Sequence, residues 1–315
     1  MPRHAIHRRG GVPHNGRVPE THYAAANGLK IAYETFGSPG DPPVLLIMGL
    51  GTQMIAWPDE MCAAIADRGR YVVRFDNRDA GLSTHLDELP APKLGDLLLR
   101  RQSPPYDVSD MAADALGVLD ALEIDSAHVV GASMGGFIAQ TLAGLHPARV
   151  RSLTLMMTST GSRLVGRPKP RIFLRLLRRR IVRDRLEAME AVVETFRIIG
   201  SQGFAFDEEY LRDLAGRSYD RGYDPHGYVR QLAAAMAQPN RTGALRRLRV
   251  PTLVMHGLDD PLVHVSGGLA LARAIPGAEF IGFPGMGHDL PRQLWPRFAE
   301  EICSLTARVD AERTG

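Results

Sequence analysis

Val129-Val130-Gly131-Ala132-Ser133-Met134-Gly135-Gly136 is the stretch of sequence that decides the fold. The apolar run that begins at His128 predicts a buried strand, and helical spacing of apolar residues over 137–145 predicts a helix directly after it. A serine between a strand and a helix occupies a sharp, strained turn that tolerates only small neighbours. The glycines on both sides supply that room, so the turn would expose the hydroxyl of Ser133. The pattern therefore indicates a serine poised for nucleophilic attack.

Strands and helices alternate on both sides of this turn. A hairpin is expected over 21–36, with Asn27-Gly28 as its turn. A helix is expected over 108–122, with Ser109 as its cap. Further strands are expected at 44–48, 71–75, 153–157, 252–256 and 279–283, and further helices at 57–69, 269–274 and 293–307. This alternation predicts an α/β fold, with a mostly parallel central sheet that is flanked by helices.

The alternation stops between Gly161 and Leu248, where the sequence is charged and rich in helical patterns. An insertion between two sheet strands would lie over the carboxyl ends of the strands, where open α/β sheets place their sites. We name residues 161–248 the lid. The rest of the chain divides into a disordered leader (1–20) and an α/β core (21–160 and 249–310).

Apolar residues of the lid exceed what a charged loop would carry. Some are expected to pack on the core and others to line a substrate cleft above Ser133. They are Ile172, Phe173, Leu176, Leu177, Phe196, Ile198 and Ile199. The lid is thus expected to control which substrates enter, without taking part in the chemistry.

The charge balance argues against a nucleic-acid partner. The 38 basic residues are nearly matched by 35 acidic ones, which gives a formal net charge of +3. The basic residues are not interleaved with aromatic residues as in proteins that bind single strands. Cys62 and Cys303 lie far apart and outside any metal-ligand spacing. We therefore expect no disulfide, no metal, no cofactor and a reduced, cytoplasmic setting.

The sequence allows membrane contact only at the periphery. The sequence holds no apolar run long enough to cross a bilayer, and residues 1–20 lack the apolar core of a signal peptide. The basic stretch 170–180 would form an amphipathic helix, which can lie on anionic lipid. A lid helix with a solvated arginine face explains the same pattern more simply. We expect no integral membrane segment and keep peripheral lipid contact as the alternative.

Two further segments carry the partners that a serine nucleophile requires. A base must accept the serine proton, and an acid must orient that base. Asp259-Asp260 follows the strand expected at 252–256, and His288 lies in a small-residue loop after the last strand. The order Ser133, Asp260, His288 is the one found where a serine follows a strand in this way. The proline after Asp260 favours it as the acid, and Asp259 remains the alternative.

Acyl transfer also needs backbone donors for a developing oxyanion. One usually follows the nucleophile, and the other comes from an early loop at a strand end. The N–H of Met134 is the first candidate. The N–H of Leu50, between two glycines after the strand at 44–48, is the second. Trp57 follows shortly afterwards and is expected either to wall the acyl pocket or to be an ordinary core tryptophan.

From Thr21 onward the chain resembles the α/β-hydrolase superfamily. Residues 75–83, Phe-Asp-Asn-Arg-Asp-Ala-Gly-Leu-Ser, are similar to that fold's Asp-x-Arg-Gly-x-Gly-x-Ser loop, with Asp79 where glycine is commoner. Met48-Gly49-Leu50 is similar to its His-Gly-x oxyanion loop, with methionine in place of histidine. Together with 57–59 and 285–288, these motifs resemble the branch of aclacinomycin methylesterase and related bacterial carboxylesterases.

This resemblance implies the α/β-hydrolase fold, with a helical lid inserted between sheet strands, and a catalytic triad of Ser133, Asp260 and His288. The implied activity is hydrolysis of a small-molecule carboxylic ester without a metal. A cofactor-free perhydrolase or a lactonase would use the same triad. A non-catalytic hydrolase-fold receptor is the alternative from another class, and the complete triad argues against it. A dehalogenase is disfavoured because it needs a carboxylate at position 133.

Overall fold

A sheet of eight strands forms the centre of the computed structural model, which describes residues 19–93, 95, 103–172 and 182–314. The strands are β1 (His22–Ala26), β2 (Leu29–Phe36), β3 (Pro43–Ile47), β4 (Tyr71–Phe75), β5 (Ala127–Ala132), β6 (Val150–Met156), β7 (Thr252–Gly257) and β8 (Glu279–Phe283). Their order across the sheet is β1-β2-β4-β3-β5-β6-β7-β8. β1 and β2 form the expected hairpin, β2 is antiparallel to β4, and the other neighbouring strands are parallel.

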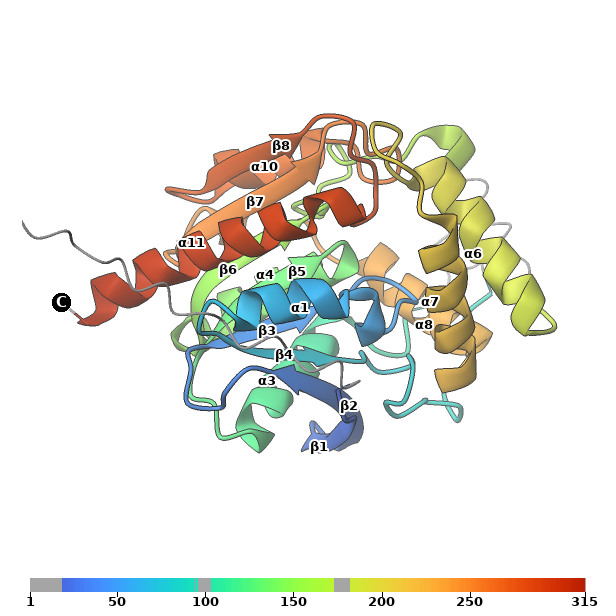
Figure 1. Cartoon of the computed structure of the whole chain (residues 1–315), viewed down its shortest axis with the longest axis horizontal. Helices are drawn as coiled ribbons and strands as arrows, with labels where there is room; N and C mark the ends of the chain where they lie inside the picture. The colour runs from blue at the N-terminus through green and yellow to red at the C-terminus, as the bar shows by residue number, and fades with distance from the viewer. Residues whose placement is uncertain (1–18, 94, 96–102, 173–181, 315) are drawn as a thin grey trace, which may run out of the picture.

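Helices cover both faces of this sheet (Figure 1). α1 (Asp59–Ala66) and α11 (Trp295–Thr314) lie on one face, and α3 (Val108–Ala121), α4 (Met134–Leu145) and α10 (Ser266–Ala274) lie on the other. In β3, Val44 and Leu46 belong to the apolar cluster of α1 and α11, whereas Leu45 and Ile47 belong to that of α3 and α4. A strand buried on both faces must be apolar throughout. The expected sheet with two covered faces is thus confirmed.

The lid contributes helices between β6 and β7. They are α6 (Arg185–Ile199), α7 (Glu208–Arg221), α8 (Pro225–Ala237) and α9 (Thr242–Leu245). Short 3₁₀ helices occur elsewhere: η1 (Met54–Ala56), η2 (Pro147–Arg149) and η3 (Arg292–Leu294). Figure 1 shows α6, α7 and α8 together at one end of the sheet, on the right of the view. The candidate catalytic residues lie in the turns after β5, β7 and β8. The loops that contain these turns line a cleft together with residues of the lid.

One helix cap differs from the prediction. α3 is capped by Asp107, not by Ser109: the Asp107 carboxylate accepts from the N–H groups of Ser109 and Asp110, at 2.6 and 3.2 Å. The Asp110 carboxylate in turn accepts from the N–H of Asp107, which completes a capping box. Of the leader expected at 1–20, residues 1–18 lie outside the described part of the chain, as do residues 173–180 of the basic stretch.

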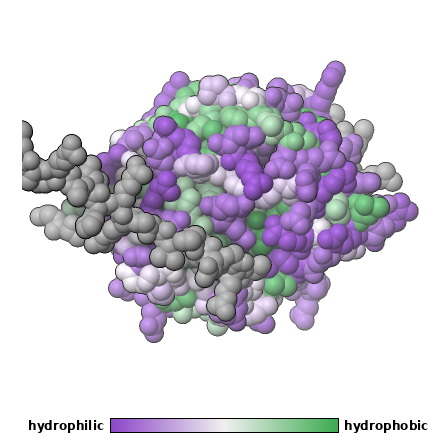
Figure 2. Space-filling view, in the orientation of Figure 1, coloured by the Kyte–Doolittle hydropathy of each residue, from purple (hydrophilic) through white to green (hydrophobic). Residues whose placement is uncertain are grey.

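The surface in the view of Figure 2 is mostly hydrophilic, with apolar patches set among polar side chains. Within the described ranges, no helix combines the length and the apolar character that crossing a bilayer requires.

Candidate active site

Ser133 lies at the turn between β5 and α4, with φ 54° and ψ −118°. A non-glycine residue at positive φ is strained and persists only where its surroundings hold it. The N–H of Ser133 donates to the carbonyl of Met156 on β6 at 2.9 Å. A Cβ atom on Gly131 would lie 2.3 Å from the carbonyl oxygen of Gly135, and one on Gly135 would lie 2.1 Å from that of Ile47. The turn therefore requires glycine at both positions.

Ser133, His288 and Asp260 form a continuous series of hydrogen bonds. Ser133 Oγ lies 3.1 Å from His288 Nε2, and His288 Nδ1 lies 2.7 Å from Asp260 Oδ2. A carboxylate only accepts, so Nδ1 carries a proton and Nε2 can accept from the serine hydroxyl. Asp260 is buried, and its Oδ1 accepts from the N–H groups of Leu262 and Val263, each at 2.8 Å. These bonds fix the carboxylate against the imidazole.

The neighbouring Asp259 has a different place. It is exposed, and its Oδ2 accepts from the N–H of Gly285 at 2.8 Å. The structure thus brings Asp260, and not Asp259, to His288. His256 supports the loop of Asp260: its ring is fully buried, burial lowers its pKa, and Nε2 donates to the carbonyl of Val263 at 2.7 Å. A neutral imidazole therefore braces the acid loop from the core.

The two candidate oxyanion donors border Ser133. Met134 is the first residue of α4, and N–H groups of the first helical turn have no partner within the helix. The loop of Leu50 approaches from β3: a Cβ atom on Gly49 would lie 3.0 Å from Ser133 Cβ and 3.5 Å from its Oγ. Among hydrogen bonds between described residues, the N–H of Leu50 takes part in none. Both candidate donors therefore lie beside the serine at the cleft.

A cleft of about 2080 Å³ opens over Ser133, with walls from both the core and the lid. Leu50, Met134 and His288 also line it. Four of the apolar lid residues named from the sequence line it as well: Ile172, Phe196, Ile198 and Ile199. Phe173, Leu176 and Leu177 lie outside the described residues.

Trp57 does not line this cleft, which corrects the expectation that it walls the acyl pocket. Its side chain is fully buried in the apolar cluster that α1 and α11 form against the sheet. The residues on either side of it, Ala56 and Pro58, do reach the cleft. Trp57 is therefore an ordinary core tryptophan, because its indole packs in this apolar cluster.

Lid residues at the end of α6 and just after it hold the loop of the candidate base. The N–H of His288 donates to the carbonyl of Ile199 at 2.7 Å, and the N–H of Gly287 donates to Ser201 Oγ at 3.0 Å. The Ser201 hydroxyl in turn donates to Asp289 Oδ1 at 2.5 Å, and burial raises the pKa of Asp289. These contacts could not be predicted from the sequence, because they join distant segments and no motif marks Ser201.

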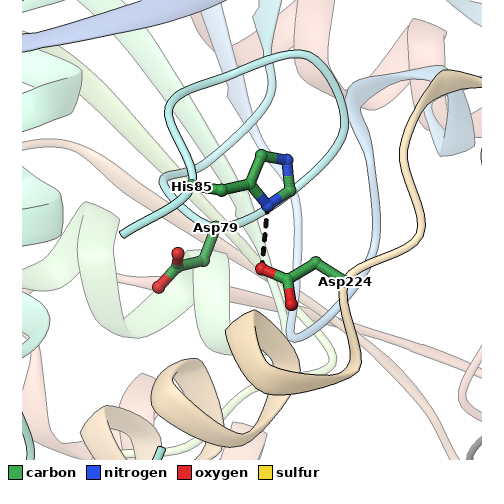
Figure 3. A group of neighbouring side chains, drawn as sticks. All are labelled: Asp79, His85 and Asp224. Carbon is green, nitrogen blue, oxygen red and sulfur yellow. Dashed lines mark hydrogen bonds and ion pairs between the residues drawn. The ribbon is translucent and has the colours of Figure 1, made fainter. Parts of the chain in front are cut away.

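A second polar cluster joins the lid to the core and comprises Asp79, His85 and Asp224 (Figure 3). Ligand atoms of these residues lie within 4.8 Å of one another, a spacing that could hold a metal ion. Arg230 of α8 already supplies a cation: Nε and Nη2 donate to Asp79 at 2.9 and 2.8 Å, and Nη2 lies 3.3 Å from Asp224 Oδ2. His85 bonds Asp224 at 2.8 Å and the carbonyl of Gly81 at 2.9 Å. We assign this cluster a structural role.

Known proteins match this chain over most of its length. Residues 42–291 match the family described as alpha/beta hydrolase fold. The rhodomycin D methylesterase of Streptomyces sp. (strain C5) is 32% identical over 297 residues, which cover 87% of this chain and 93% of that protein. The 2-hydroxymuconate semialdehyde hydrolase of Pseudomonas sp. (strain CF600) is 30% identical over 284 residues, which cover 85% of this chain and 88% of that protein.

Solved structures show the same fold. The enol-lactonase of Burkholderia xenovorans LB400 superposes with a TM-score of 0.69 at 24% identity, and the match covers 91% of this chain and 100% of that one. This chain therefore belongs to the α/β-hydrolase fold family. The expected fold class and the resemblance to the methylesterase branch are both confirmed.

Proposed function

We propose that this chain, a carboxylic ester hydrolase of the α/β-hydrolase fold family, works through an acyl-enzyme on Ser133. One observation carries the proposal: the hydrogen-bonded series from Ser133 Oγ through His288 to Asp260, with contacts of 3.1 and 2.7 Å, at a cleft walled by the lid. A serine hydroxyl becomes an effective nucleophile when an oriented base accepts its proton. The arrangement meets that requirement.

The reaction has two halves. Ser133 Oγ attacks the ester carbonyl while His288 Nε2 takes its proton, and the resulting oxyanion lies between the N–H groups of Leu50 and Met134. As the tetrahedral intermediate collapses, His288 returns the proton to the departing alcohol, which leaves the acyl group on Ser133. Water then attacks the acyl-enzyme with His288 again as the base, and the acid and the free serine are released. Asp260 holds the imidazole in the required tautomer throughout.

For the substrate, we propose an ester of a bulky acid with a small alcohol. Two relatives, at 32% and 30% identity, are rhodomycin D methylesterases, enzymes whose name specifies a methyl ester. The cleft of this chain, about 2080 Å³, exceeds the range of about 300–1,000 Å³ typical of small-ligand pockets. Apolar and aromatic lid side chains contribute much of its wall, which suits a large acyl group. We further propose a cytoplasmic enzyme that needs no cofactor and has no nucleic-acid partner.

A panel of esters tests the substrate. Methyl esters of aromatic acids of increasing ring number are compared with bulky-alcohol esters of the same acids, and the released acid is measured by chromatography. We expect the specificity constant to rise with acid size and to fall with alcohol size. Peracid formation in hydrogen peroxide would favour a perhydrolase, faster opening of lactones would favour a lactonase, and no turnover at all would favour a receptor.

Ser133→Ala tests the mechanism. Loss of a nucleophile that acts as a unit with its base lowers turnover by about 10⁶-fold in a well-studied serine enzyme, so less than a thousandth of wild-type activity is expected here. The variant should melt at or above the wild-type temperature, because alanine removes only one hydroxyl. A fluorophosphonate should label the wild type at one equivalent and should not label the variant. Retained turnover in a folded variant would remove Ser133 from the mechanism.

A further inference from the structure

Helix α8 of the lid bonds directly to the loop that carries the Leu50 amide. Gln231 on α8 is fully buried, and its Oε1 accepts from the N–H of Gly51 at 2.7 Å. Its Nε2 donates to the carbonyl of Arg78, also at 2.7 Å. Tyr228, one turn earlier, packs on the same glycine, since a Cβ atom on Gly51 would lie 2.4 Å from its ring. A lid helix thus fixes the residue next to the candidate oxyanion donor.

The peptide groups around Leu50 are held at several atoms. The hydroxyl of Thr52 donates to the carbonyl of Leu50 at 3.1 Å, and the N–H of Thr52 donates to the carbonyl of Gly49 at 3.3 Å. Each peptide group is planar, so a bonded carbonyl fixes the direction of the N–H on the other side of the same group. The bond of Gln231 to Gly51 anchors the next peptide. The N–H of Leu50 donates to no other described residue.

The position of α8 is itself fixed by the residue before Gln231. Arg230 forms the two-pronged ion pair with Asp79 described above, and both side chains are buried. Asp79 holds φ 62°, a conformation that a non-glycine residue adopts at a cost of about 1 kcal/mol or more. Adjacent residues of α8 therefore bond adjacent residues of the core, Arg230 to Asp79 and Gln231 to Arg78. This pair of contacts limits sliding of the helix along the core.

We infer that Gln231, together with Thr52, is a positioning residue for the oxyanion hole. Gln231 holds the peptide between Leu50 and Gly51. It thereby restrains the adjoining peptide between Gly49 and Leu50, whose N–H points toward the carbonyl oxygen of the substrate. The inference rests on the proposed function, because it takes Leu50 as an oxyanion donor. It assigns to the lid a part in the chemical step, and not only in the admission of substrate.

Gln231→Met tests the inference, since methionine has a similar length and makes no comparable hydrogen bond. Complete loss of one oxyanion donor lowers kcat by about 10²–10³-fold, so a donor that is only loosened should lower kcat by about 10–100-fold. KM should stay within about threefold, because the oxyanion forms after substrate binding. A trifluoromethyl ketone adduct places a tetrahedral oxyanion in the hole, so its affinity should fall in parallel with kcat.

Gln140→Met is the matched control. Gln140 is also a buried glutamine that bonds a backbone carbonyl, that of Ser159 at 3.0 Å, but it does not bond the oxyanion loop. It should keep the wild-type kcat. Thr52→Val is the second variant, because it is isosteric and half-buried, and it removes only the side-chain bond to Leu50. It should show a loss of about threefold in kcat with a parallel loss of ketone affinity.

Thermal melting first shows which variants fold, and the kinetics of the folded variants then decide whether the inference holds. A folded Gln231→Met with wild-type kcat, or with a changed KM alone, would overturn the inference. An equal loss in Gln140→Met would also overturn it. If Gln231→Met does not fold, an unchanged kcat in Thr52→Val overturns the inference, and the expected loss supports it. Turnover by Ser133→Ala would instead reject the proposed function, which the other variants do not test.

Discussion

Loss of the Arg230 guanidinium should destabilise the protein more than loss of any exposed arginine. The Asp79 carboxylate accepts from Arg230 twice, from the N–H of Leu86 at 2.7 Å and from the hydroxyl of Tyr106 at 2.7 Å. Burial alone would raise the pKa of Asp79, but the bonds from Arg230, Leu86 and Tyr106 outweigh it and the pKa lies below its ordinary value. Asp79 is therefore ionised in the native state and depends on these donors.

The magnitude follows from what Arg230→Met leaves behind. Removal of one partner of a buried ion pair costs about 3–5 kcal/mol, because the other charge stays buried without compensation. Two neutral donors to Asp79 remain, so the lower end, about 3 kcal/mol, is expected. With about 2–4 °C per kcal/mol for domains of 150–250 residues, the melting temperature should fall by about 6–12 °C. Differential scanning fluorimetry and urea unfolding would measure the change.

A second substitution tests the cause. Asp79→Gly in the Arg230→Met background removes the stranded charge and places glycine at φ 62°, where it is unstrained. The double variant should therefore be more stable than Arg230→Met alone. Arg185→Met, which breaks the half-exposed pair with Asp220 at 3.0 Å, is the control and should cost less than about 1 kcal/mol. Additive effects of the Asp79 and Arg230 changes within about 0.5 kcal/mol would refute the reasoning.

Two further predictions follow from the described geometry. Asp260→Asn should lower kcat by about 10⁴-fold, because the amide favours the wrong tautomer of the His288 imidazole. Asp259→Asn should keep most of the activity, since an amide oxygen can still accept from the N–H of Gly285. The opposite ranking of the two rates would show that Asp259 is the acid. Burial lowers the pKa of His128 to about 4 from 6.5, so the unfolded state binds a proton at higher pH than the native state. The free energy of unfolding should therefore fall by up to about 3 kcal/mol as the pH drops from about 7 to about 4. Urea unfolding across this pH range should show a weaker pH dependence of that free energy for His128→Gln than for the wild type. Equal pH dependence in the two proteins would contradict the assignment.

The parts of the fold that the sequence predicted are those with a local signal. The β3 strand is an apolar run because it is buried on both faces. The small residues around Ser133 are required because a Cβ atom added there would lie as little as 2.1 Å from a backbone oxygen. Asp260 and His288 could be located because each follows a strand whose neighbours are parallel, so the strand ends meet. Trp57 could not be placed, since a core tryptophan and a pocket tryptophan look alike in sequence.

The contacts that hold the site had no such signal. Gln231 bonds Gly51 across 180 positions, and Ser201 bonds Gly287 across 86. Each is a single polar residue in a helical or loop segment, where exposed glutamines and serines are common. The sequence did mark Asp79 as unusual, because it stands where this fold more often has glycine. The physical reason became visible only with its partner Arg230, which lies on a lid helix.

The contacts of the lid favour a role for it beyond the admission of substrates, which is the role predicted from the sequence. The lid was expected to admit substrates and to leave the chemistry to the core. Two lid segments instead bond the two core loops that carry candidate catalytic groups: Gln231 bonds the loop of Leu50, and Ile199 bonds the backbone of His288. Both bonds fix backbone atoms beside a group to which we assign a part in the reaction, where a displacement of about 1 Å can lower the rate a hundredfold. A change in the lid that reshapes the cleft for another acid should therefore also shift the proposed oxyanion donor or the proposed base. Selectivity and rate should vary together in lid variants.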